Sequence, residues 1–94
     1  MSLQNNFQKE LIKSLKAKDK AKTGVLRLIL AQIQEKLIEK QAEITDEEAA
    51  DILRRQQKLR VEAIKLYQKA GRKDLAEKEE AEKKIIESFL KPSA

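Results

Sequence analysis

Hydrophobic residues recur at helical spacing along the whole chain. In the first segment they come every four residues, at Leu3, Phe7, Leu11 and Leu15, which places them on one face of a helix. Three further segments carry similar stripes. Helices are therefore expected over residues 3–20, 22–41, 45–70 and 74–90. The pattern predicts an all-α fold, an antiparallel bundle of four helices that forms a single domain over residues 1–94.

Three short signals mark the start of the third helix and the point where it meets the fourth. The T-x-x-E sequence from Thr45 to Glu48 is a capping box, in which the hydroxyl and the carboxylate bind each other's backbone amides. Gly71 suits the left-handed position that ends a helix, because glycine has no Cβ to clash there. Asp74, followed three residues later by Glu77, is expected to cap the next helix. Residues 71–73 would then turn the chain into a helical hairpin.

A few charged side chains fall where apolar ones are expected. Arg27 interrupts the apolar run VLRLILA, so it either reaches solvent or pairs with a carboxylate. Glu79 and Glu82 share a face with Leu75 and Ile86 in the last helix. Unpaired carboxylates would be costly there. We therefore expect Arg60 or Arg27 to pair with Glu82, and Tyr67 or an arginine to bind Glu79; a loose, wet upper half of the last helix is the alternative.

The composition excludes several kinds of chemistry. The 94 residues include no Cys and no His, which rules out disulfides, cysteine-based zinc sites and imidazole catalysis. No serine or threonine has a base arranged around it in a recognisable motif, and no glycine-rich phosphate loop is present. We expect no metal site, no cofactor and no catalysis. The start lacks a signal peptide's apolar core and no apolar run reaches membrane length, so a cytoplasmic location is expected.

The net charge of +5 is uneven along the sequence, and its excess falls mostly in residues 1–22. In a helix over residues 3–20, four lysines would share the face opposite the apolar stripe: Lys9, Lys13, Lys16 and Lys20. Such a row can bind phosphates, although a solvated polar face is the ordinary alternative. Four further cations could extend the surface: Arg54, Arg55, Lys58 and Arg72.

Several motifs together resemble one family. They are K-x-K-D-K from Lys16, VLRLILAQI from Val25, I-T-D-E-E from Ile44, Y-x-x-AGR-x-DLAEKE-x-AE from Tyr67, and F-L-x-P from Phe89 to Pro92. Nearly the whole chain is similar to the GatB/YqeY family of small bacterial helical proteins. The resemblance implies an N-terminal helical part and a smaller C-terminal part like the tail of a tRNA-dependent amidotransferase subunit. That second part is absent here, so the chain is expected to be either naturally short or a fragment.

The resemblance supplies no established catalytic residues. The positions that match the family's motifs are Arg27, Tyr67, Gly71, Arg72, Asp74, Glu79 and Glu82, and they are expected to define the fold. The favoured function is a non-catalytic accessory module that binds tRNA, or a tRNA-handling protein complex, through weak contacts with the RNA backbone. A protein-interaction module, including a homo-oligomer, is the alternative. A carbon–nitrogen ligase with glutamine as amido donor has the least support.

Overall fold

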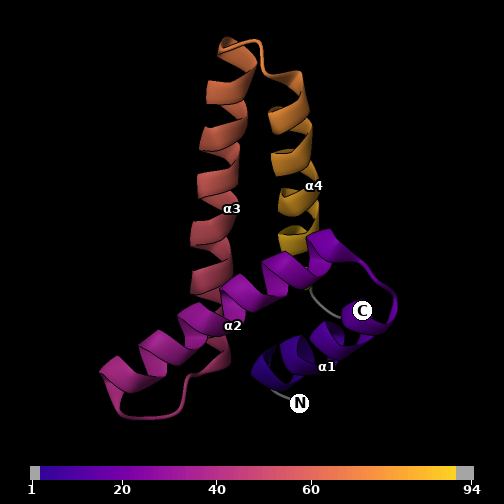
Figure 1. The fold of residues 1–94 in the computed structure, drawn as a ribbon. Helices are drawn as coiled ribbons and strands as arrows, with labels where there is room; N and C mark the ends of the chain where they lie inside the picture. The colour runs from indigo at the N-terminus through magenta and orange to yellow at the C-terminus, as the bar shows by residue number, and fades with distance from the viewer. Residues whose placement is uncertain (1–2, 91–94) are drawn as a thin grey trace. The chain divides into compact units, whose positions relative to one another are not determined.

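The computed structural model describes residues 3–90, and these residues form four helices and no strand (Figure 1). The helices are α1 (Leu3–Lys16), α2 (Lys20–Lys40), α3 (Asp46–Lys69) and α4 (Lys73–Leu90). The prediction of an all-α fold with four helices is confirmed. The chain divides into two compact units, residues 1–52 and residues 53–94, and the boundary falls inside α3. That the 94 residues act as a single domain stays a prediction, and Pro92 lies outside the described residues.

In the first unit α1 and α2 pack against each other. The fully buried side chains here are the apolar ones that the periodicity selects, with Phe7 from α1 and Leu26, Ile29 and Ile33 from α2. Each fully buried side chain of this size stabilises the fold by about 1.5–3 kcal/mol. The core of this unit therefore depends mainly on α2, the helix with apolar residues on several faces.

The first helix ends earlier than the sequence pattern predicts. It stops at Lys16, and Lys18 takes a left-handed conformation with φ 56°. Asp19 then caps α2, because its carboxylate accepts a hydrogen bond of 3.1 Å from the Lys22 amide. The expected continuous helix over residues 3–20 is wrong at its C-terminal end, and Lys20 belongs to α2.

Two buried hydroxyls tie this turn together. Thr23 Oγ1 lies 2.9 Å from Ser14 Oγ and 2.7 Å from the carbonyl oxygen of Asp19. The Ser14 hydroxyl in turn donates to the carbonyl of Leu11 at 2.8 Å. Buried hydroxyls need such partners, so the pair fixes how α1 meets α2.

The expected capping box is present at the start of α3. The Glu48 amide donates to Thr45 Oγ1 at 3.1 Å, and the Thr45 amide donates to Glu48 Oε1 at 3.0 Å. The ammonium of Lys40 also binds Glu48 Oε1. This cation and the amide lower the pKa of Glu48 from its usual 4.5 to about 2.

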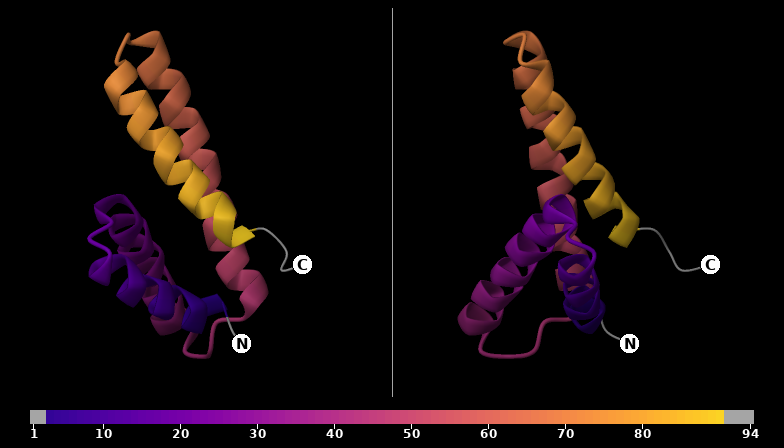
Figure 2. Two further views of the ribbon diagram at one scale, coloured as in Figure 1. Left: turned by 90° about the vertical axis from the view of Figure 1, so that its right-hand side faces the viewer. Right: turned by 45° about the vertical axis from the view of Figure 1, so that its right-hand side comes forward.

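The second unit consists of the rest of α3 and of α4, which form the predicted hairpin (Figure 2). Gly71 has φ 71° in the turn, as expected. Helix α4 begins at Lys73, so the prediction that Asp74 caps it is wrong. Asp74 lies inside the first turn, where its carboxylate binds the guanidinium of Arg72 at 3.2–3.3 Å. The Arg72 guanidinium, with the amide of Leu75, lowers the pKa of Asp74.

Candidate functional site

The lysine row expected on the first helix does not form as one surface. Lys9, Lys13 and Lys16 lie on α1, whereas Lys20 lies beyond the turn on α2. Glu10 also interrupts the positive charge, since its carboxylate lies 4.0 Å from Lys13 Nζ and 3.1 Å from Lys22 Nζ. The first unit as a whole holds nine Lys and Arg residues and nine Asp and Glu residues. Its cations are therefore less suited to holding phosphates than the sequence pattern indicates.

A shallow groove of about 420 Å³ lies where α1 meets α2. Three cations contribute to its walls, Lys18, Lys20 and Arg27. Arg27 is exposed and pairs with no carboxylate of residues 3–90. The sequence allowed Arg27 either to reach solvent or to pair with a carboxylate, and in the structure it reaches solvent. Arg27 is therefore not the partner of Glu82.

The outer face of α3 carries a denser group of cations. Residues 53–94 hold 12 Lys and Arg against 7 Asp and Glu, an excess of five positive charges. Helical spacing places five of these cations in the sector of α3 that contains no side chain bound to α4. They are Arg54, Arg55, Lys58, Lys65 and Lys69, and we call them the α3 basic face. All five are exposed.

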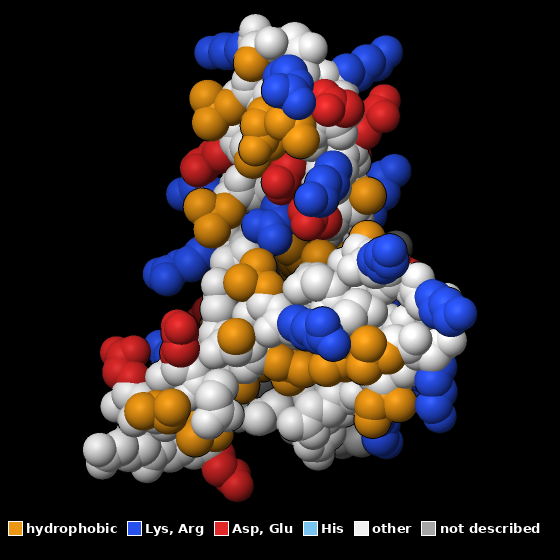
Figure 3. All heavy atoms as spheres, viewed as in Figure 1, with side chains coloured by type: hydrophobic (Ala, Val, Ile, Leu, Met, Phe, Trp, Pro, Cys, Tyr) orange, Lys and Arg blue, Asp and Glu red, His pale blue; other side chains and the backbone are white. Residues whose placement is uncertain are grey.

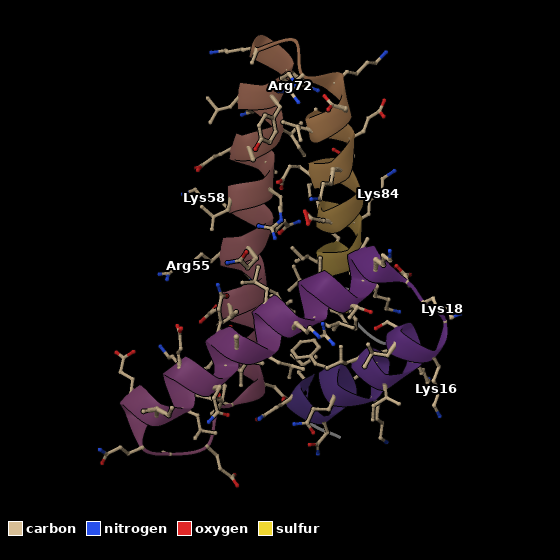
Figure 4. All side chains as sticks on the ribbon, viewed as in Figure 1. Lys16, Lys18, Arg55, Lys58, Arg72 and Lys84 are labelled. Atoms are coloured by element: carbon tan, nitrogen blue, oxygen red, sulfur yellow. The ribbon has the colours of Figure 1, made fainter. Side chains whose placement is uncertain are left out.

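Charge on the α3 basic face is largely uncompensated. Arg55, Lys58, Lys65 and Lys69 pair with no carboxylate of the described residues. Figure 4 shows Arg55 and Lys58 extending from α3 away from α4. Between Arg54 and Lys69, Glu62 is the acidic residue in this sector, while Glu47 and Asp51 share the sector nearer the start of α3. The arrangement is a cationic strip about 20 Å long on a rigid helix, which can neutralise several phosphates at once.

Lys65 and Lys69 were missed by the sequence reasoning, although the signal was available. Lys58 follows Arg54 by four residues, Lys65 follows Lys58 by seven, and Lys69 follows Lys65 by four, which is the spacing of one helical face. The net charge of residues 45–70 is only +1, because the acidic residues at the start of this segment, Asp46, Glu47, Glu48 and Asp51, offset most of its cations and hid this concentration. Arg72, by contrast, was predicted for the same surface and lies in the hairpin turn bound to Asp74.

The other residues singled out from the sequence form a charge cluster inside the hairpin. Arg60 Nε lies 3.3 Å from Glu79 Oε2 and 3.8 Å from Glu82 Oε2. The three side chains are only 14%, 21% and 20% exposed. Arg60 Nη1 donates to Gln56 Oε1 at 3.0 Å, whereas Arg60 Nε has no hydrogen-bond acceptor in suitable geometry.

The expected pairing of Glu82 with Arg60 is thus confirmed, and an arginine also serves Glu79. One guanidinium compensates two carboxylates, which explains why acids are tolerated on the packed face of α4. Tyr67 is half-buried on α3. Within residues 3–90, no group of three or more Asp or Glu side chains is placed to hold a metal ion.

The sequence can also be compared with those of known proteins. The family model described as "Yqey-like protein" matches residues 4–93. The chain belongs to the YqeY-like family. Its match covers α1 to α4, so the charge cluster of the hairpin and the α3 basic face both lie inside the family's domain.

Two relatives extend the comparison. An uncharacterized protein of Schizosaccharomyces pombe, C22F3.15, is 33% identical over 89 residues, which is 95% of this chain and 72% of the relative. "Altered inheritance of mitochondria protein 41, mitochondrial" of Lachancea thermotolerans is 35% identical over 86 residues. That match covers 90% of this chain and 46% of the relative. The chain therefore spans less than half the length of the second relative.

Two observations concern membrane association and cellular location. No helix in residues 3–90 is both long and apolar enough to cross a bilayer. One relative carries the word mitochondrial in its name. The cytoplasmic location of this chain stays a prediction.

Proposed function

We propose that this YqeY-like chain is a non-catalytic accessory module of tRNA metabolism that binds the phosphate backbone of RNA. The observation that carries the proposal is the α3 basic face, a set of exposed cations on one side of one helix. Four of its members have no acidic partner among the described residues. Cations that are already unpaired need no salt bridge to be broken before they meet a phosphate.

Affinity on such a surface comes from releasing the counterions that surround the nucleic acid. It is independent of base sequence, because the contacts reach phosphates and not base edges. Base stacking has little support, since the chain contains two Phe and one Tyr and Phe7 and Tyr67 are at least half-buried. We therefore expect binding that is weak, steeply dependent on salt and tolerant of RNA sequence.

The test is a titration of mixed tRNA with the full chain at two salt concentrations. The variant Lys58→Gln/Lys65→Gln removes two charges from the centre of the α3 basic face. Its matched control, Lys78→Gln/Lys84→Gln, removes two exposed lysines from α4 and leaves the net charge the same as in the first variant. Figure 4 shows Lys84 extending from α4 away from α3.

On the proposal, the α3 variant binds tRNA about tenfold more weakly at low salt. The slope of log K against log salt falls by about 1.5, because each lost phosphate contact removes roughly 0.7–0.9 from it. The α4 control should keep most of the affinity. Equal losses in both variants, or no binding by the wild type at low salt, would overturn the proposal.

A further inference from the structure

A strip of apolar residues on α3 is left uncovered beside the basic face. Leu59 is 47% exposed and Leu66 is 67% exposed, and they are seven residues apart. Ala63 follows Leu59 by four residues and Ala70 follows Leu66 by four, and both alanines are at least partly exposed. We call these four residues the α3 seam. Figure 3 shows hydrophobic side chains alternating with charged ones along this edge of α3.

We propose that the α3 seam is a dimerisation surface, on which α3 of a second copy of this chain packs antiparallel. The spacing of the seam, four and then three residues, is the heptad spacing of helices that pair in a coiled coil. Leu59 and Leu66 take one of the two core positions of the heptad, and Ala63 and Ala70 take the other. The face of α3 that holds Arg60 against α4 is a different one.

Direction follows from the sizes of the side chains. In a parallel, in-register pair, each leucine would face a leucine and each alanine an alanine, which leaves alternating crowded and empty layers. In the antiparallel pair, Leu59 faces Ala70 of the second copy and Ala63 faces Leu66 of the second copy. Every layer then combines one large and one small side chain, and the two helices can approach closely.

Charges beside the seam favour the same register. In this antiparallel pairing, two residues that lie at the same level along the axis have numbers that add up to 129, as Leu59 and Ala70 do. Glu62 and Lys69 of the second copy sum to 131, so they are offset by only about 3 Å along the axis. Both residues flank the seam on the same side. In coiled coils, ion pairs at such flanking positions determine which helices pair and in which orientation. The twofold symmetry produces this pair twice.

Other charges of α3 remain compatible with the dimer. Lys58 and Lys65 point into the sector of α3 away from the seam, so pairing does not consume the centre of the α3 basic face. The dimer engages Lys69 at one end of that face, and its test needs no RNA. The seam is short, with four layers of Leu against Ala, so the dimer is expected to be weak and transient. A dissociation constant on the order of 0.1 mM is expected.

Sedimentation equilibrium of the full chain, over concentrations from about 10 µM to 1 mM, tests the proposal. The wild type should show a monomer–dimer equilibrium. Leu66→Gln should weaken it at least tenfold without unfolding the chain, because the side chain is exposed and Gln is a good helix former. Ile38→Gln changes an equally exposed apolar residue on α2 and should leave the equilibrium unchanged.

A charge swap tests the register itself. Glu62→Lys alone and Lys69→Glu alone each place like charges together and should weaken the dimer several-fold. The double variant Glu62→Lys/Lys69→Glu restores opposite charges and should recover the wild-type dissociation constant. A wild type that stays monomeric at 1 mM would overturn the dimer. A dimer that ignores Leu66→Gln, or a swap that does not recover, would overturn the seam as its interface.

Discussion

Lys18 and Gly71 occupy the same position in two copies of one helix-ending motif. Lys18 follows α1 and Gly71 follows α3, and both have a positive φ, of 56° and 71° respectively. In each copy the next residue's N–H donates to the carbonyl oxygen five residues earlier, at 2.9 Å and 2.8 Å. This is the hydrogen bond of the Schellman motif. One copy thus uses the residue that suits the left-handed conformation, and the other uses a lysine that does not.

Exchanging the residue types at these two positions should change stability in opposite directions. A left-handed L-residue costs roughly 1–2 kcal/mol, and the greater freedom of glycine in the unfolded chain offsets about 0.5–1 kcal/mol of that. Lys18→Gly should therefore raise the free energy of unfolding by about 0.5–1 kcal/mol, and Gly71→Ala should lower it by about 1 kcal/mol. A Cβ at Gly71 would meet no atom within 4 Å, so the effect there comes from the backbone alone. Urea unfolding followed by circular dichroism measures both changes. A destabilised Lys18→Gly would show that the lysine side chain stabilises the turn by more than its backbone costs.

Arg60 should be among the most sensitive positions in the hairpin. Arg60→Met removes the cation and leaves Glu79 and Glu82 facing each other with no compensating charge. The expected loss is about 2–4 kcal/mol, somewhat below the cost of breaking a fully buried pair, because all three side chains keep some solvent contact. Thermal and urea unfolding measure the loss.

The matched control neutralises the acids in the same background. Arg60→Met/Glu79→Gln/Glu82→Gln contains no buried charge at this site, so it should regain at least half of the lost stability. If the triple variant were as unstable as Arg60→Met, the arginine would act through packing and not through charge.

The sequence predicted the helices and the hairpin because those features have local causes. The capping box at Thr45 and Glu48 involves residues three apart, and Gly71 is a single-residue signal. The pairing of Arg60 with Glu82 could also be predicted from the sequence, because two helices joined by a short turn have a nearly fixed register. In each case the interacting groups lie close in sequence or are tied by a turn of known length.

The errors arose where a local pattern had two solutions. Residues 16–20 continue the helical charge pattern, but Asp19 competes by capping the next helix, and a lysine at a left-handed position gives no glycine signal. Asp74 likewise reads as a cap, yet α4 starts one residue before it. The earlier end of α1 moved Lys20 off the predicted row, and Arg72 lies in the hairpin turn paired with Asp74. The candidate site shifted from α1 to α3 for that reason.

The Ser14–Thr23 hydroxyl pair should stabilise the turn between α1 and α2. Thr23→Val keeps the shape of the side chain but removes the hydroxyl, so the buried Ser14 Oγ loses its contact with it and the Asp19 carbonyl keeps only the hydrogen bond from the Thr23 amide. We expect a loss of about 1–2 kcal/mol in the free energy of unfolding. Ser14→Ala should cost about 1 kcal/mol. Because the two hydroxyls share a contact, the double variant should lose less than the sum of the single losses. Strict additivity in urea unfolding would contradict the shared contact.

Acid should weaken the start of α3 through Glu48. Its pKa falls from 4.5 to about 2 on folding, chiefly because the Lys40 ammonium and the Thr45 amide favour the ionised carboxylate. A carboxyl whose folded pKa is lowered contributes stability that is fully present above its unfolded pKa and is lost as pH falls through its folded pKa. The advantage of the wild type over Glu48→Gln should thus be largest above about pH 5, shrink between pH 4.5 and pH 2, and vanish below. Unfolding both proteins in urea at a series of pH values measures this difference directly. Lys40→Gln removes the main cause of the lowered pKa. In that background, the stability difference between Glu48 and Glu48→Gln should depend on pH much less. An equal dependence would show that the lysine does not hold the carboxylate in its ionised form.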